Sequence, residues 1–415
     1  MRLLLIVPLL PGGGGGLAPN LGIVTLAALT PPDIEVLVID ENVEKLNFDE
    51  EIDLVGITVM TPTAIRAYEV ADVFRKRGTA VVLGGFHPSA MPEEAIQHSD
   101  SIVIGEAEEI WTTLLHDFEL GKLGKFYRRK ELANLENQSI PRRDLLKAKA
   151  YTMFNTVETA RGCPFRCSFC SVASFFSNTY RFRPVKDVVK EVETLEGKYL
   201  FFVDDNIVKI PRRAKELFKA VTPCKKKWIG QASLTFARDE ELLKLAAESG
   251  CIGMFIGFES LSQASLREVG KSFNVVKHYE EAIKKIHAHG ISIHGAFIFG
   301  FDHDDESVFE KTVEFVKNNK LDSVSFSTLT PFPGTPIYQK LIKENRIVTK
   351  DWSKYGGAVF RPKLMSREVL DEGCKWAWKE CYSYKSIFTR LGIPKGNWFL
   401  RLLLNLGYKK AIGCL

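Results

Sequence analysis

Three cysteines lie within eight residues of one another in the segment ARGCPFRCSFCSV (160–172), at positions 163, 167 and 170. A structural zinc site usually takes four ligands in two separated pairs, whereas no histidine or fourth cysteine stands near this triplet. Three thiolates on one loop suit a cubane iron–sulfur cluster in which one iron lacks a protein ligand. The spacing therefore predicts Cys163, Cys167 and Cys170 as metal ligands, with an open iron that binds another molecule.

Polar side chains also follow apolar runs further along the chain. They are Asp204, Asp205 and Asn206 after YLFFV (199–203), Gln231 within WIGQASL (228–234), and Glu259 with Ser260 after CIGMFIGF (251–258). Polar residues directly after a wholly apolar run are hard to explain by packing. They are typical of a binding site at the carboxyl end of a strand.

These candidates lie in a region where short apolar runs alternate with helical patterns. The runs are expected as strands at 155–161, 199–205, 228–234, 251–258, 291–300 and 322–329. Six βα units predict a partial (β/α)6 barrel, whose active site lies at the carboxyl ends of its strands. The three cysteines follow the first of these strands, so they are expected at the mouth of the barrel.

A separate alternation precedes the barrel. Apolar runs at 2–9, 34–40, 53–60, 80–86 and 101–106 predict a doubly wound parallel sheet of the Rossmann-like type, whose ligands bind beyond the carboxyl ends of the strands. Small residues there permit close approach by a large, flat or phosphate-bearing ligand. The glycine run at 12–16 lacks the G-x-G-x-x-G form, so a nicotinamide site is weakly supported. The candidate ligand contacts are Gly16, Thr58, Thr61, Gly84, Gly85, Gly105 and Glu106.

The fold class is therefore α/β with a helical C-terminal region. We expect an N-terminal domain over 1–130, a linker over 131–150, a barrel domain over 151–345 and a helical region over 346–415. The polar segment from 126 to about 150, which Pro141 interrupts, is expected as the interdomain connector. The apolar stretch 397–412 favours a packed helix, and contact with a membrane or a greasy substrate is the alternative.

Composition disfavours several classes of protein. The chain has 415 residues, 45% hydrophobic and 26% charged, which is typical of a globular protein with two or three domains. Its net charge of +5 comes without a basic stripe, so nucleic acid is not an expected partner. Eight cysteines are too few for a disulfide scaffold, and no apolar window reaches the length of a membrane span. The opening MRLLLIVPLL indicates a buried strand rather than a secretory signal, and a cytoplasmic location is expected.

The cysteine spacing, the strand before it and the barrel after it resemble the radical S-adenosylmethionine (SAM) superfamily. In that family the open iron of a [4Fe–4S] cluster chelates the amino and carboxylate groups of SAM. An electron from the cluster then cleaves SAM to methionine and a 5′-deoxyadenosyl radical. The resemblance implies a [4Fe–4S] cluster, SAM, and a reductant protein such as flavodoxin or ferredoxin.

The N-terminal region resembles the cobalamin-binding branch of the same superfamily, through VGITVMTPT, VVLGGFHPS and IGEAEE at strand ends and TPFPGTPIYQ further on. Many cobalamin domains carry D-x-H-x-x-G after the first strand, with a histidine that ligates cobalt from below. Here the loop is PLLPGGGGGLAPN, which has no histidine. The resemblance therefore implies base-off cobalamin without a lower histidine ligand. His87 is expected as a wall residue, with a substitute ligand as the alternative.

The resemblance also implies roles for the candidate residues. Phe169 is similar to the aromatic that packs on adenine, and Asp204, Asp205 or Asn206 to the residue that holds the amino group of SAM. Gln231, Glu259 and Ser260 are placed like residues that bind its carboxylate and ribose. The stretch GAFIFG (295–300), which includes Phe299, is similar to the strand whose main chain contacts adenine. Arg161 either balances the charge of the cluster or forms an ordinary salt bridge.

Together these features predict a cobalamin-dependent radical SAM methyltransferase that removes hydrogen from an unactivated carbon and adds a methyl group there. A protein or peptide side chain is the favoured substrate, and a lipid or polyisoprenoid is the alternative. Some members of this branch use cobalamin for ring closure or rearrangement without methyl transfer, and the sequence does not separate that chemistry from methylation. A carrier or sensor without catalysis is disfavoured, because it needs no polar groups at the ends of barrel strands.

Overall fold

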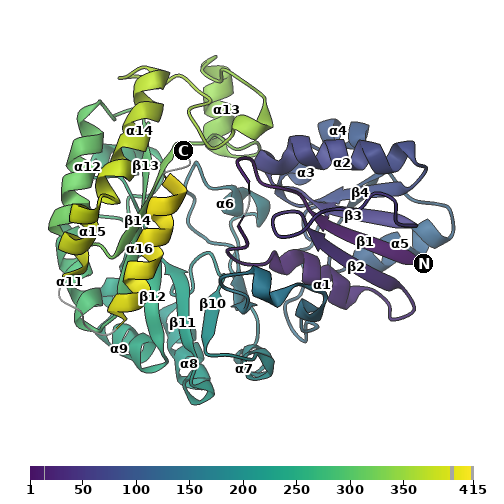
Figure 1. The fold of residues 1–415 in the computed structure, drawn as a ribbon, viewed down its shortest axis with the longest axis horizontal. Helices are drawn as coiled ribbons and strands as arrows, with labels where there is room; N and C mark the ends of the chain where they lie inside the picture. Colours follow the sequence, from purple (N-terminus) through teal and green to yellow (C-terminus); the bar gives the residue numbers. More distant parts are fainter. Residues whose placement is uncertain (14, 393–396, 413–415) are drawn as a thin grey trace.

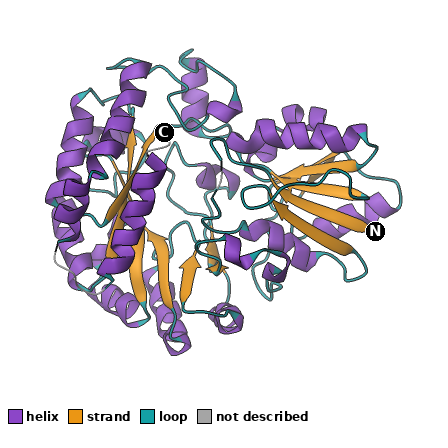
Figure 2. Ribbon diagram, in the orientation of Figure 1, coloured by secondary structure: helices purple, strands orange, loops and turns teal. Residues whose placement is uncertain are grey.

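The computed structural model describes residues 1–13, 15–392 and 397–412. Figure 1 shows two α/β parts side by side, each built on its own sheet, with the N-terminus on the smaller part. Loops and the short helix α6 (Ser171–Phe175) lie between the two sheets (Figure 2). The boundary between the parts is therefore formed by the segments expected to bind ligands.

The N-terminal part is a six-stranded parallel sheet in the order β2-β1-β3-β4-β5-β6. Its strands are β1 (Arg2–Val7), β2 (Glu35–Asp40), β3 (Leu54–Thr58), β4 (Ala80–Gly84), β5 (Ser101–Ile104) and β6 (Phe126–Arg128). Helices α1 (Leu21–Leu29) and α5 (Trp111–Glu119) cover one face, and α2 (Ala64–Lys76), α3 (Phe86–Ala90) and α4 (Pro92–Ala95) cover the other. The doubly wound sheet predicted from the sequence is confirmed.

Central strands of this sheet are apolar on both faces because helices cover both. In β1, Leu4 and Ile6 belong to the core beneath α2, whereas Leu3 and Leu5 belong to the core beneath α1 and α5. A continuous apolar run, rather than an alternating one, is typical of such a strand. The first ten residues are thus explained as a core strand.

The sixth strand differs from the expectation. β6 lies in the segment that polarity marked as a connector, yet it pairs in parallel with β5 through Ile102 opposite Phe126. Its residues are exposed or half-buried because it is an edge strand, so it lacks the apolar pattern of a central strand. The rest of the connector contains two 3-10 turns, Arg143–Leu145 and Ala148–Ala150.

The second part is a six-stranded parallel sheet in the order β14-β13-β12-β11-β10-β7. Its strands are β7 (Thr156–Val157), β10 (Tyr199–Phe202), β11 (Lys227–Ala232), β12 (Cys251–Glu259), β13 (Ser292–Phe299) and β14 (Ser323–Thr328). The outer helices are α7 (Val185–Thr194), α8 (Pro211–Val221), α9 (Glu240–Glu248), α11 (Tyr279–Ala288) and α12 (Ser307–Asn318). All six predicted strands are present, and the sheet is an open, partial barrel. The first predicted strand is shorter than expected, because Ala160–Arg161 leaves the barrel and pairs antiparallel with Arg181–Phe182.

Side chains of the barrel strands alternate between the two faces of the sheet. Those that pack on the outer helices are buried, among them Phe202, Trp228, Met254, Phe258 and Phe297. Their neighbours point to the interior and are only half-buried, among them Phe201, Ile229, Gln231, Phe255 and Ile298. The interior of the barrel is therefore lined largely by apolar side chains.

The C-terminal region contains α13 (Pro336–Lys343), α14 (Arg367–Cys381), α15 (Tyr384–Leu391) and α16 (Trp398–Ile412). Helix α14 protects the free edge of β14. Just after that helix, the Tyr382 hydroxyl accepts from the amide of Val324 (3.0 Å) and donates to its carbonyl (2.6 Å), while the Trp378 indole donates to the carbonyl of Phe326 (2.8 Å). These contacts satisfy edge groups that would otherwise remain unpaired.

The apolar stretch 397–412 forms α16, which is packed on one face only. Asn405 is fully buried and its amide nitrogen donates to the carbonyl of Asp322 (2.8 Å). The other face exposes large apolar side chains, with Phe399 at 64% exposure. Across the described residues, no helix combines the length and the apolar character that a membrane span requires.

Candidate active site

The three cysteines lie on the loop between β8 (Ala160–Arg161) and α6, on the side of the barrel that faces the N-terminal part (Figure 1). Two distant segments hold this loop. Ser168 donates its amide to the carbonyl of Val269 (2.9 Å), and its carbonyl accepts from the amide of Ile337 (2.9 Å). A Cβ on Gly270 would lie 2.7 Å from the carbonyl oxygen of Arg166, so this close approach requires glycine.

Burial raises the pKa of all three thiols, that of Cys167 to about 12, while the ammonium group of Lys271 acts in the opposite direction on Cys167 and Cys170. Among the described residues, no three His, Cys, Asp or Glu side chains converge on a single metal position. In a cubane, each thiolate binds a different iron, so the three ligands are spread around the cluster and do not point to one metal position. Three thiols on one held loop fit such a cluster, which displaces their protons when it binds.

Glu259 ends β12 and forms a buried ion pair with Lys271, which lies one residue after Gly270. The backbone of Glu259 is left-handed, with φ of +63°, a strained conformation for a residue other than glycine. A Cβ at Gly257 would lie 2.2 Å from the Glu259 Oε1 atom, so this glycine makes room for the pair. The carboxylate of Glu259 is thus fixed beside the cysteine loop by its ion pair and by a strained backbone.

The three polar residues after β10 have different surroundings. Asp204 is buried and its carboxylate accepts from the amides of Thr159 (2.5 Å) and Ala160 (3.0 Å), while burial raises its pKa to about 7. Asn206 is also buried, and exchanges two hydrogen bonds of 3.2 Å with Ser233. Asp205 is half-buried and accepts from the amide of Gly162 (3.1 Å). Of the three, Asp205 is best placed to meet a ligand.

The remaining barrel candidates lie at different depths. Gln231 is half-buried on the interior face of β11, and Ser260 is buried with its hydroxyl accepting from the amide of Ser262 (3.0 Å). Phe169 is half-buried, with its ring centroid 6.3 Å from that of Phe301. The Phe299 ring stacks on Phe326 in the outer core, so only its main chain can face a ligand. This placement agrees with the main-chain role expected for 295–300.

On the N-terminal side, the edge of the sheet is built from backbone. Gly85 has φ of +103°, and a Cβ there would lie 2.9 Å from the carbonyl oxygen of Val59. The amide of His87 donates to that same carbonyl (3.1 Å). A Cβ on Gly84 would meet Val103 at an ordinary 3.6 Å. Gly85 is therefore required by the turn, and this edge, where ligands of doubly wound sheets bind, presents main chain.

His87 is fully buried beneath that edge. Its Nε2 atom lies 3.0 Å from the Tyr68 hydroxyl, and its Nδ1 atom lies 3.3 Å from the hydroxyl of Thr61. The ring also packs edge-on against Trp352, from the C-terminal region. These contacts favour the wall residue over the cobalt ligand.

Four other N-terminal candidates have structural partners. Gly16 bridges the backbone of Tyr151, and a Cβ there would lie 2.2 Å from the carbonyl oxygen of Ala150. Gly105 has φ of +85° and its amide donates to the hydroxyl of Ser89 (2.9 Å). Thr58 is half-buried beside Gly85, while Thr61 is buried against His87. The neighbouring Gly14 lies outside the described residues.

Glu106 is occupied by ion pairs with Arg161 (2.9 Å) and Arg181 (2.8 Å), which hold its pKa below the usual range despite burial. Arg161 also pairs with Glu108 and Glu158. Arg161 belongs to the barrel and Glu106 to the N-terminal sheet, so these contacts join the two parts. Arg161 thus forms a salt bridge, which was one of its two expected roles.

Comparison with known proteins places these features in a family. Residues 157–316 match the radical SAM superfamily, and residues 14–115 match the B12 binding domain. Bacteriochlorophyllide d C-12(1)-methyltransferase of Chlorobaculum tepidum is 31% identical over 407 residues, which cover 94% of this chain and 89% of that protein. The chain belongs to the cobalamin-dependent radical SAM methyltransferases. The bacteriochlorophyllide d C-8(2)-methyltransferase of the same organism is 32% identical, over 93% of this methyltransferase and 90% of that protein.

Solved structures share the fold of this methyltransferase. TsrM from Kitasatospora setae, with cobalamin and a [4Fe–4S] cluster bound, superposes with a TM-score of 0.72 over 99% of both chains, at 17% identity. OxsB, with aqua-cobalamin and SAM bound, gives a TM-score of 0.72 over 99% of this chain and 72% of that chain, at 16% identity. The predicted fold class, family and cofactors are confirmed. The domain boundaries and the roles of single residues stay predictions.

The sequence reading missed two features of the methyltransferase site. Lys271 follows a glycine in a loop, and nothing in its spacing points to Glu259 or to the cysteines. The second is the aromatic contact between the parts, in which Phe86 of α3 stacks on Phe175 of α6 at 4.3 Å between ring centroids. The pair FF at 175–176, a few residues after the cysteine motif, was an available signal, because aromatic residues are enriched at interfaces.

Proposed function

We propose that this methyltransferase transfers a methyl group from SAM, through cobalamin, to an unactivated carbon of a flat and largely apolar small molecule such as a tetrapyrrole. The names of two relatives support a tetrapyrrole as the substrate, because both are methyltransferases of bacteriochlorophyllide d. A third relative, the anaerobic magnesium-protoporphyrin IX monomethyl ester cyclase of Cereibacter sphaeroides, is 28% identical over 81% of this chain. The protein side chain favoured by the sequence reading is the competing substrate class.

The aromatic lining of the barrel interior carries this proposal. The ring of Phe201 on β10 lies 5.9 Å from that of Phe255 on β12, which lies 4.6 Å from the ring of His294 on β13. Burial lowers the pKa of His294 to about 3, so the imidazole is neutral, and its Nδ1 atom lies 2.9 Å from the hydroxyl of Ser323. His294 is itself buried, with its ring 5.7 Å from that of Tyr408 on α16, whereas Phe201 and Phe255 are half-buried. Uncharged aromatic rings of this kind favour a flat apolar ligand through burial of surface and ring stacking.

The residues at the barrel mouth have separate tasks in this proposal. Cys163, Cys167 and Cys170 hold the cluster, which with SAM supplies the radical that removes hydrogen, while cobalamin supplies the methyl group. Asp205 accepts from the amino group of SAM, and Glu259 accepts from its ribose hydroxyls. Two acceptors fixed by the fold hold the nucleoside in one orientation, which is the contribution that positioning makes to such a reaction.

The experiment is a product balance with SAM that carries a deuterated methyl group. Reconstituted protein receives a chemical reductant and a panel of chlorophyllides and protoporphyrins. We expect one S-adenosylhomocysteine and one 5′-deoxyadenosine per product, with the label in the tetrapyrrole. Label in a peptide or a lipid instead would overturn the substrate class.

The relationship to the cyclase supports a second candidate, a ring closure or rearrangement that uses the same cofactors. The same balance separates the two chemistries. Deoxyadenosine without S-adenosylhomocysteine, and without a methyl group gained by any substrate, would replace the methyltransferase proposal with this one.

A further inference from the structure

We infer that the outer side of the cysteine loop is the docking surface for an acidic protein that carries single electrons. The inference rests on the proposed function, because reductive cleavage of SAM requires an electron from outside the chain. The docking surface consists of Phe165, Arg166, Lys209, Arg238 and Phe273, which come from three loops of the barrel and from the end of the 3-10 helix Leu234–Arg238.

A stack of three groups forms the centre of the docking surface. The rings of Phe165 and Phe273 are 3.6 Å apart at their centroids and within 11° of parallel, and the Lys209 ammonium lies 3.7 Å from the Phe165 centroid. All three residues are half-buried, so each retains an accessible part. Phe165 stands two residues after Cys163 on the same loop. The stack therefore includes part of the cysteine loop and remains partly accessible.

Two exposed arginines flank the stack. Arg166 lies within the cysteine motif itself, directly before Cys167. Arg238 donates from its Nη2 atom to the carbonyl of Phe273 (2.9 Å), which fixes it at the edge of the stack. With Lys209, the docking surface presents three cationic groups around an aromatic centre. Opposite charge on a partner steers its approach and fixes its orientation.

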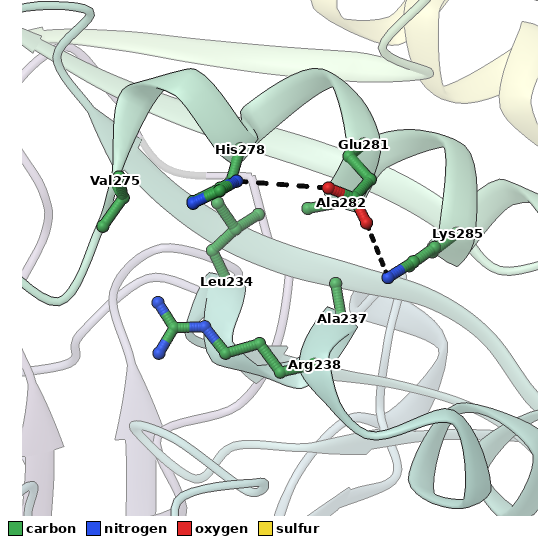
Figure 3. Close-up of a pocket in the computed structure, with 8 residues that line it drawn as sticks. All are labelled: Leu234, Ala237, Arg238, Val275, His278, Glu281, Ala282 and Lys285. Atoms are coloured by element: carbon green, nitrogen blue, oxygen red, sulfur yellow. Dashed lines mark ion pairs between the residues drawn. The ribbon is translucent and has the colours of Figure 1, made fainter.

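A pocket of about 190 Å³ adjoins the docking surface at Arg238, and Figure 3 shows its lining. The one carboxylate drawn there belongs to Glu281, which pairs with Lys285 at 2.8 Å and lies 4.0 Å from His278. The guanidinium group of Arg238 points away from that carboxylate (Figure 3). The cationic character of Arg238 is therefore not cancelled within the pocket, and a carboxylate of a partner fits beside it.

The transfer moves one electron and makes no bond. The carrier loses one electron and the cluster gains one, so the carrier must come close to the cysteine ligands without displacing substrate. The docking surface meets this condition, since Phe165 and Arg166 lie on the cysteine loop between Cys163 and Cys167 and retain accessible surface. An acidic flavodoxin or ferredoxin has the charge that this surface complements.

The test uses calorimetry at low ionic strength. It measures the binding of oxidised flavodoxin to protein with its three cysteines intact. A double variant, Arg166→Glu with Arg238→Glu, is expected to bind flavodoxin at least tenfold more weakly. Added salt is expected to weaken the wild-type complex. The matched control, Lys375→Glu with Lys385→Glu, makes the same change of charge on exposed positions of α14 and α15 and is expected to bind like the wild type.

Deoxyadenosine formation separates this inference from the proposed function. With dithionite, the Arg166→Glu and Arg238→Glu variant should match the wild type, whereas with reduced flavodoxin it should be slower by tenfold or more. Absence of product in the wild type with dithionite would count against the proposed function alone. Equal weakening by the control variant, no wild-type affinity for flavodoxin or ferredoxin, or tighter binding of a DNA oligonucleotide would each overturn the docking surface.

Discussion

The two sides of the active site are built from different chemistry. On the barrel side, the candidate groups belong to side chains: three thiols, the carboxylate of Asp205, and the Glu259–Lys271 pair. On the N-terminal side, the edge of the sheet presents backbone, and its key residue, Gly85, is there because it has no side chain. A site of the first kind fails when a group is removed, and a site of the second kind fails when atoms are added.

The largest expected effect is on the barrel side. Replacing Cys163, Cys167 and Cys170 together by Ala removes every protein ligand of the cluster. Anaerobically reconstituted protein should carry about four irons per chain, and the variant close to none. Iron and sulfide analysis with the absorbance of the cluster measures this.

Control variants for the cluster each remove one cysteine that lies outside the motif. Cys224→Ala and Cys251→Ala remove thiols outside the motif, one half-buried and one buried in the barrel core. Both are expected to keep the full iron content. Full iron in the triple variant would show that the cluster is held elsewhere.

The next largest effect is on the N-terminal side and comes from a single added methyl group. Gly85→Ala forces an alanine into φ of +103° with its Cβ 2.9 Å from a carbonyl oxygen. We expect a loss of about 1–3 kcal/mol of stability and loss of cobalamin binding. Gly84→Ala is the matched control, because its Cβ meets only an ordinary contact at 3.6 Å. Thermal melts and cobalamin absorbance after desalting compare the two, and equal occupancy in both variants would refute a role of this backbone edge in cobalamin binding.

The difference between the two sides also explains what the sequence could reveal. Cysteine spacing and polar residues after apolar runs are visible in the sequence, so the candidate residues could be assigned to the mouth of the barrel before the fold was known. The Glu259–Lys271 pair was not predicted, because the two residues are 12 positions apart and meet only through the left-handed turn at Glu259. A single lysine in a loop gives no sign of the carboxylate it will contact.

Strand prediction failed where burial was low. Central strands are apolar on one or both faces, and all of these were found. β6 is exposed at the edge, so the polarity of Phe126–Arg128 and its surroundings indicated a connector. The ion pairs that Glu106 forms with two arginines of the other part were also not predicted. Contacts between domains are not encoded in local patterns.

A moderate effect is expected when the barrel side loses one acceptor. Glu259→Ala removes the acceptor proposed for the SAM ribose, and the expected loss is about 1.5–3 kcal/mol for a charged acceptor, or roughly ten- to a hundredfold in affinity. Cobalamin occupancy should not change, since Glu259 belongs to the other side of the site. Equilibrium dialysis with labelled SAM measures the affinity.

Lys271→Met sharpens this prediction. It leaves the Glu259 carboxylate buried without its cation, so it should destabilise the fold more than Glu259→Gln does. If both variants bind SAM like the wild type, then the pair is structural and Glu259 does not contact the nucleoside.

The smallest expected effect is on cobalt itself. His87 has both ring nitrogens near the hydroxyls of Tyr68 and Thr61 and is fully buried, so His87→Ala should leave the absorbance spectrum of bound cobalamin in the base-off form, as in the wild type. Removing a buried ring is expected to lower the melting temperature, because a cavity forms beside Trp352. A change from a histidine-ligated to a base-off spectrum would show that the ring turns to meet cobalt, and the N-terminal side would then depend on a side chain as the barrel side does.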